Sequence, residues 1–218
     1  MNKKTLTYIL LLAITFITSL IITEKSIYIA PHLIISASLI VYSITFLLTA
    51  KLNEEINIKD TKTILKKIVI STLIFYILMM LINTIHGITD TKEITNALRE
   101  IFTPNKFTIY KSSIYYPNLI NLISSLFIFY LSHNIFSITN EITKDYTSKT
   151  ISFIISILIS FIIDQMIYIS LIDFLPLYKS TITLTNYIEN LTASFIIVIM
   201  SSIIMTIIYL ITQKRSKN

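Results

Sequence analysis

The stretch Phe153-Ile-Ile-Ser-Ile-Leu-Ile-Ser-Phe-Ile-Ile-Asp-Gln-Met-Ile-Tyr-Ile-Ser-Leu-Ile172 decides the fold class of this chain. It is long enough for one helix to cross a bilayer, because a hydrocarbon core of about 30 Å needs about 20 apolar residues. Asp164 interrupts it, and a carboxylate at mid-membrane costs at least about 2.5–3.5 kcal/mol on insertion scales. We therefore expect Asp164 to face a cavity or a partner group inside a helix bundle.

Further polar residues share one face of this predicted helix. At successive i, i+4 positions stand Ser156, Ser160, Asp164 and Tyr168, and Gln165 follows the acid directly. Residues at this spacing lie one above the other on a helix. We predict that this polar stripe points into a bundle and binds a ligand.

The composition of the whole chain indicates an integral membrane protein. Hydrophobic residues make up 54% and charged residues 14% of its 218 residues, and the mean hydropathy is +0.74. We predict an all-α fold with a single membrane domain over residues 1–218. Its six transmembrane helices are expected at about 5–23, 27–49, 65–85, 117–137, 152–174 and 188–212. No small-residue cleavage site follows the first apolar stretch, so we interpret it as a retained helix.

The distribution of basic residues predicts the orientation. One side of the predicted helices carries Lys3, Lys4, Lys51, Lys59, Lys62, Lys66, Lys67, Lys144, Lys149, Lys214, Arg215 and Lys217. The other side carries only Lys25, Lys92, Arg99, Lys106, Lys111 and Lys179. By the positive-inside rule, both termini are expected in the cytoplasm. The net charge of +6 is then explained by anionic lipid headgroups, and nucleic-acid binding is not expected.

The sequence lacks the residues that several classes of chemistry require. The chain has no cysteine, one glycine and three histidines far apart in sequence. This excludes disulfides, thiol catalysis and Gly-rich phosphate loops, and the histidines show no known metal-binding spacing. We predict no metal, no cofactor and no catalytic residue. The adjacent Glu54 and Glu55 offer an intramembrane hydrolase as an alternative, but a solvated cytoplasmic turn is the stronger interpretation.

Polar residues outside the fifth predicted helix are weaker candidates. His133 and Asn134 stand in the last turns of the fourth predicted helix, and for them, as for Gln165, both a functional and a structural role are open. Pro31-His32 and Asn83 lie near helix ends, where water reaches them. The segment Thr91–Phe102 has apolar residues at helical spacing, so a short amphipathic helix is expected there, either as an interfacial connector or as a lid.

Two segments together resemble the bacterial queuosine precursor transporters, once described as putative vitamin uptake transporters. The family has six membrane helices, and an early one ends in a Phe-Leu-x-Thr-Asp-x-x-Asn-Glu turn. This chain has Phe46-Leu-Leu-Thr-Ala-Lys-Leu-Asn-Glu54, so Asn53 and Glu54 match that turn. The second family block, Arg-x-x-x-Ser-Thr-x-x-Ser-Gln-x-x-Asp-Thr-x-x-Phe, aligns with Ser152–Tyr168. A weaker match covers Ser125–Phe129, followed by Ser132-His133.

The resemblance spans roughly residues 30–175 and keeps the acid and the serines. The chain departs from the family at Ala50, Ser152, Ile157, Phe161 and Gln165. The resemblance implies uptake of 7-deazaguanines, the purine-like precursors of queuosine, across the bacterial cytoplasmic membrane. A guanine-type edge offers two parallel donors that one carboxylate can accept together. Asp164 would anchor that edge, with Ser156, Ser160, Gln165, Tyr168, His133 and Asn134 as further substrate-binding residues.

The leading hypothesis is therefore a membrane permease, not an enzyme, for a purine-like small molecule. Phe129, Phe161 and Tyr168 are candidates for stacking on its ring. The alternative class is a non-transporting scaffold or assembly subunit, in which Asp164 pairs with a basic residue of another membrane chain. A partner subunit or a second copy of this chain stays open in both hypotheses.

Overall fold

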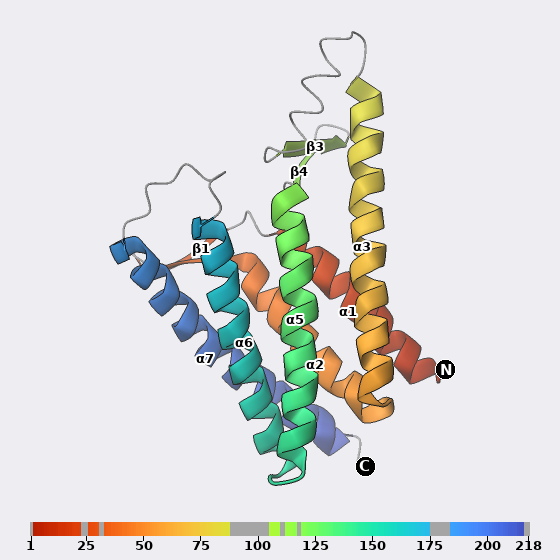
Figure 1. Cartoon of the computed structure of the whole chain (residues 1–218), viewed down its shortest axis with the longest axis vertical. Helices are drawn as coiled ribbons and strands as arrows, with labels where there is room; N and C mark the ends of the chain where they lie inside the picture. Colours follow the sequence, from red (N-terminus) through yellow and green to blue (C-terminus); the bar gives the residue numbers. More distant parts are fainter. Residues whose placement is uncertain are drawn as a thin grey trace.

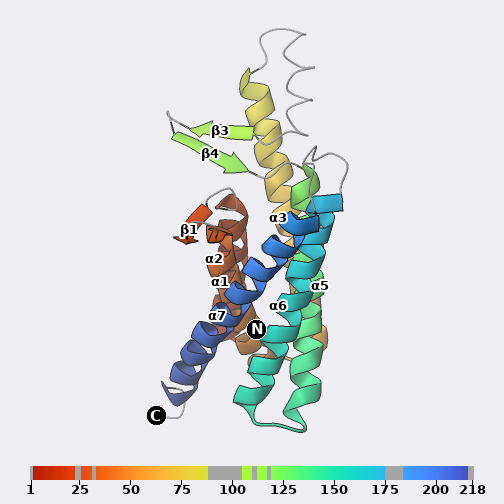
Figure 2. The ribbon, with the colours of Figure 1, turned by 90° about the vertical axis from the view of Figure 1, so that its left-hand side faces the viewer.

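The computed structural model describes residues 2–22, 26–30, 33–87, 105–109, 112–116, 119–174 and 184–215. In chain order these residues form α1 (Lys3–Ile21), β1 (Ser26–Ala30), β2 (Leu33–Ser36), α2 (Ala37–Glu55), α3 (Ile58–Gly87), β3 (Asn105–Ile109), β4 (Ser112–Tyr116), α5 (Leu119–Lys144), α6 (Lys149–Phe174) and α7 (Leu184–Arg215). The helices form a bundle, and two antiparallel hairpins, β1–β2 and β3–β4, lie toward one end of it (Figure 1, Figure 2). Both termini lie toward the opposite end, as do the α2–α3 and α5–α6 connections (Figure 1).

Short polar connections set where the helices begin. The side chain of Asn57 accepts a hydrogen bond from the backbone N–H of Asp60 (2.8 Å) and so caps the start of α3. Ser148 caps α6 in the same way, through the backbone N–H of Ile151 (3.4 Å). Such caps satisfy backbone donors that have no partner within the helix. Short turns thus connect α2 to α3 and α5 to α6.

Four helices of the described chain are long and apolar enough to cross a membrane. These spans are Lys3–Ile21, Leu122–Lys144, Lys149–Ile167 and Phe195–Thr212. Their outward faces carry large apolar side chains, such as Phe127 on α5 and Ile203 on α7, which are 56% exposed. In water, apolar surface of this extent would be unstable, whereas lipid accommodates it. The chain is a multi-pass membrane protein.

Helix α2 lies in the middle of the bundle. Its residues join two apolar clusters: Leu48 and Leu52 pack with α1, α3 and α5, and Phe46 and Ala50 pack with α5, α6 and α7. Within the described residues, α2 and α3 are not among the four spans that meet the length and hydropathy requirement. For α2 the physical reason is its position, because a helix surrounded by other helices can carry more polar residues than a lipid-facing one.

Several predicted boundaries were wrong. The second predicted helix, 27–49, is a hairpin over Ser26–Ser36 followed by α2, which runs on to Glu55. Glu54 and Glu55 therefore end a helix and do not lie in a loop. The second hairpin, Asn105–Tyr116, was not predicted. β-branched and aromatic residues stabilise either conformation, and alternation over so few residues is a weak signal.

Other boundaries shifted less. Helix α5 continues seven residues beyond the predicted end at residue 137, to Lys144. His133 is therefore in mid-helix, and it is fully buried. The predicted amphipathic helix over 91–102 and the dipeptide Pro31-His32 lie outside the described residues, and so does the side chain of Asn83.

A buried polar contact joins α5 to α6 near their connection. The Ser152 hydroxyl lies 2.7 Å from Asn140 Oδ1 and 2.7 Å from Thr143 Oγ1. Replacing Ser152 with Ala is expected to lower the free energy of unfolding by about 0.6–2 kcal/mol, because it leaves the Asn140 oxygen buried without this donor. Thermal unfolding in detergent measures the change. Thr192→Ala, which removes an exposed hydroxyl bonded to its own helix (2.8 Å), is the control, and equal melting temperatures for the two variants would contradict the prediction.

Candidate functional site

The polar stripe of α6 faces the interior of the bundle. Ser152, Ser156 and Ser160 are fully buried, and Asp164 is 4% exposed. The side chain of Tyr168 lies outside the described residues. An acid buried this deeply needs hydrogen-bond donors, because an unpaired buried charge is strongly unfavourable.

Asp164 has one donor on each carboxylate oxygen. The Tyr42 hydroxyl of α2 donates to Oδ1 (2.7 Å), and the Gln165 side-chain amide donates to Oδ2 (3.1 Å). Bonds from neutral donors to a carboxylate are stronger than bonds between neutral groups. Each oxygen has a second lone pair, so the carboxylate can accept further donors. Asp164 therefore links α6 to α2 and keeps lone pairs that a ligand's donors could use.

The hydrogen bonds continue from Tyr42 into α5. The Ser132 hydroxyl lies 3.1 Å from the Tyr42 hydroxyl and 3.4 Å from His133 Nδ1. His133 Nδ1 also lies 2.9 Å from the backbone oxygen of Phe129, and its Nε2 lies 2.8 Å from Thr45 Oγ1 on α2. A continuous hydrogen-bonded chain thus connects Asp164 to His133 across three helices.

We call this set of residues the polar centre; its members are Tyr42, Thr45, Ser132, His133, Asp164 and Gln165. Aromatic rings enclose it. Phe46 stacks on the His133 imidazole with 4.3 Å between ring centroids and 8° between planes, and Phe129 lies at 4.2 Å. Phe161 lies 5.4 Å from Phe46. The polar centre is therefore a water-poor site that combines one carboxylate with flat apolar surfaces.

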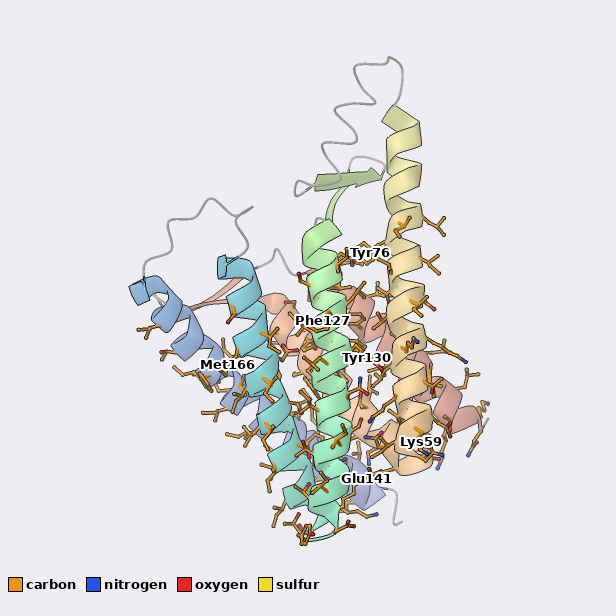
Figure 3. The ribbon with its side chains drawn as sticks, in the orientation of Figure 1. Lys59, Tyr76, Phe127, Tyr130, Glu141 and Met166 are labelled. Atoms are coloured by element: carbon orange, nitrogen blue, oxygen red, sulfur yellow. The ribbon has the colours of Figure 1, made fainter. Side chains whose placement is uncertain are left out.

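The remaining predicted site residues have separate surroundings. Ser156 donates to the Ser152 backbone oxygen (2.7 Å), within its own helix. Asn134 donates to the backbone oxygen of Tyr130, on the side of α5 toward α3, and the described residues supply no partner for its buried Oδ1. The rings of Tyr130 and Tyr76 lie between α3 and α5 (Figure 3). Within the described residues, Asn134 forms no hydrogen bond with Asp164.

Ser160 is a predicted residue on the same helix as Asp164 with an unused polar group. It is fully buried one helical turn before Asp164, and its hydroxyl has no hydrogen-bond partner among the described residues. A buried hydroxyl without a partner is unfavourable by about 1–3 kcal/mol. Such a group is available to a ligand that reaches the carboxylate.

The two residues of the predicted family turn lie at the far end of α2. Asn53 donates to the Ser137 hydroxyl of α5 (3.1 Å). Glu54 accepts a hydrogen bond from Tyr209 of α7 (2.6 Å) and forms an ion pair with Lys51 (3.0 Å). These contacts tie the end of α2 to α5 and α7. They are structural contacts at the end of the bundle that also carries both termini.

Three members of the polar centre were missed by sequence reasoning. Tyr42 and Thr45 stand in a helix whose predicted start was wrong, so their inward face was not visible. The sequence did contain one indication of a polar helix face, because Tyr42, Thr45 and Thr49 fall at i, i+3, i+7. Ser132 directly precedes His133 and was noted only as part of a weak match. None of these residue types is unusual alone in a membrane helix.

The fold and the polar centre define a class: a multi-pass membrane protein with an acid and a histidine hydrogen-bonded inside its helix bundle. Neither a protein-family model nor a curated protein nor a solved structure matches the chain.

Proposed function

We propose that this protein is a permease that imports a queuosine precursor, a 7-deazaguanine-type purine analogue, across the bacterial cytoplasmic membrane. The observation that carries the proposal is the polar centre: one buried carboxylate, enclosed by aromatic rings, inside a membrane-embedded bundle. The segments that carry the resemblance to the queuosine precursor transporters include Asp164, a member of this centre, and Phe46, one of the rings that enclose it.

The chemistry of the site suits a purine edge. A guanine-type ring presents N1–H and an exocyclic amine side by side, and the free lone pairs of Asp164 accept both. The Ser160 hydroxyl, which lacks a partner among the described residues, supplies one more hydrogen bond. Phe161 and Phe46 offer flat faces for stacking on the ring. No covalent bond is made or broken in this scheme, so the protein acts as a carrier and not as an enzyme.

A transport assay tests the proposal. Bacterial cells that neither make nor import 7-deazaguanines receive this chain or an empty vector, and uptake of a labelled 7-deazaguanine is measured at matched membrane levels. Uptake above the vector control, inhibited by unlabelled 7-deazaguanine but not by an unlabelled pyrimidine, is the expected result. A folded, membrane-inserted protein that gives the vector's background would refute the proposal.

One observation favours a second candidate, a non-transporting scaffold. Both oxygens of Asp164 already have donors from this same chain, as expected for an acid that only holds helices together. A scaffold would co-purify with another membrane protein and show no uptake. The hydrolase alternative is not carried further, because Glu54 is engaged by Lys51 and Tyr209 and Glu55 is exposed at the helix end.

A further inference from the structure

We propose that the polar centre couples transport to protons, with Asp164 and His133 as the two groups that hold the transported proton. This inference rests on the proposed transport function and adds its energy source. It is carried by the hydrogen-bonded chain between the two residues. Chains of acids and histidines inside membrane helices are a recurring means of proton relay.

A count of hydrogens shows that His133 can take a second proton without a rearrangement. Its Nδ1 faces the Phe129 carbonyl oxygen at 2.9 Å, so Nδ1 carries a hydrogen. Its Nε2 faces Thr45 Oγ1, and that hydroxyl is also within hydrogen-bond distance of the Tyr42 carbonyl oxygen. The single hydroxyl hydrogen of Thr45 satisfies only one of these two acceptors.

Two protonation states therefore fit the same heavy-atom positions. In the first, Thr45 donates to the Tyr42 carbonyl and a protonated Nε2 donates to Thr45, which makes His133 an imidazolium. In the second, the Thr45 hydroxyl turns to donate to an unprotonated Nε2, and His133 is neutral. Rotation of one hydroxyl thus accompanies the gain or loss of one proton.

The other end of the chain accepts the same proton. Tyr42 donates to Asp164, so the Tyr42 oxygen is free to accept from Ser132, and Ser132 can accept from His133 Nδ1 over the longest link, 3.4 Å. A shift of one hydrogen along each of these three bonds moves one proton from His133 to Asp164. It converts an imidazolium and a carboxylate into a carboxylic acid and a neutral imidazole whose remaining hydrogen is on Nε2. The bond from Nδ1 to the Phe129 carbonyl oxygen is given up in that state.

The hydrogen-bonded chain from Asp164 to His133 runs along the length of the bundle. Asp164 stands 15 residues after Lys149 on α6, and His133 stands 11 residues before Lys144 on α5. At 1.5 Å per residue these positions lie about 22 Å and about 16 Å from the end where α5 and α6 connect. Asp164 is thus nearer the hairpin end, and His133 is nearer the end that carries both termini.

Other titratable groups are distant. Among the described residues, the titratable side chains in this hydrogen-bonded chain are Tyr42 from α2, His133 from α5 and Asp164 from α6. Helix α1 contributes the ring of Phe16, which does not titrate. From α7, Tyr209 binds Glu54, about 18 Å along α2 from Tyr42. One proton therefore has two main sites, Asp164 and His133.

This arrangement couples the movement of a proton to the movement of the substrate in the same direction. A substrate edge made of donors needs the carboxylate form of Asp164, which requires the proton to leave Asp164. When the proton moves to His133, substrate and proton are both bound. The opposite charges of the imidazolium and the carboxylate attract each other, which offsets part of the cost of burying both.

Purified protein in liposomes tests the inference. With acid outside, labelled 7-deazaguanine should accumulate inside, up to about tenfold for a gradient of about one pH unit at one proton per substrate. A trapped pH-sensitive dye should report substrate-dependent acidification of the interior. A protonophore should abolish accumulation but leave equilibration down the substrate gradient.

Variants of the links test the relay itself. Ser132→Ala removes the central link and Tyr42→Phe removes the donor to Asp164, and both should abolish accumulation and substrate-dependent acidification. The control Thr139→Ala removes a partly buried hydroxyl elsewhere on α5 and should retain both. If the native chain takes up substrate with no effect of the gradient and no acidification, proton coupling is refuted and the proposed function stands. If the folded native chain takes up nothing, the proposed function fails and this inference fails with it.

Discussion

Replacing Asp164 with Asn is expected to reduce 7-deazaguanine uptake at least about thirtyfold. Loss of a buried, hydrogen-bonded charge from a binding site typically costs about 2–5 kcal/mol, and about 1.4 kcal/mol is a factor of ten. Asn has almost the same shape as Asp but offers one acceptor oxygen and one amide donor. It therefore cannot accept the two parallel donors of a guanine-type edge.

The variant should still fold, because its oxygen can keep the bond from the Tyr42 hydroxyl. Uptake is measured at matched membrane levels, and folding is checked by monodispersity and thermal unfolding in detergent. Met166→Leu is the matched control, since Met166 is 46% exposed and lies on the outer side of the same helix (Figure 3). An Asp164→Asn chain that folds and transports like this control would exclude Asp164 as the substrate anchor.

Replacing Phe46 with Ala is expected to cause the largest loss of stability among these substitutions. Its ring is fully buried and packs against His133, Phe136 and Phe161. Truncation of such a ring costs about 3–5 kcal/mol. In a membrane protein, apolar association gains little from the removal of water, so the cost comes from lost packing contacts and the resulting cavity.

Thermal unfolding of the purified protein measures this effect. Phe75→Ala on α3 is the matched control, because that ring is 43% exposed on the lipid-facing side of the bundle and its contacts are replaced by lipid or detergent. The melting temperature should fall much further for Phe46→Ala than for Phe75→Ala. Equal shifts would mean that the centre of the bundle is not packed as described.

The sequence predicted the membrane class because hydrophobicity is a local property. Each of the six predicted spans overlaps one helix of the described chain, and Ser156, Ser160 and Asp164 of the predicted stripe are buried. Helix ends were less predictable. Whether Ser26–Ser36 pairs as a hairpin or begins a helix depends on contacts with other segments, and its β-branched residues are compatible with both.

From the residues alone, this chain is expected in a bilayer, with Asp164 buried against a partner group. The identity of that partner group came from the packing of the helices. Tyr42 stands 122 residues before Asp164, and Thr45 stands 88 residues before His133. The physical reason is that these contacts depend on how three helices are rotated and shifted against one another, which the packing of side chains such as Phe46 and Phe129 fixes and which no local pattern specifies.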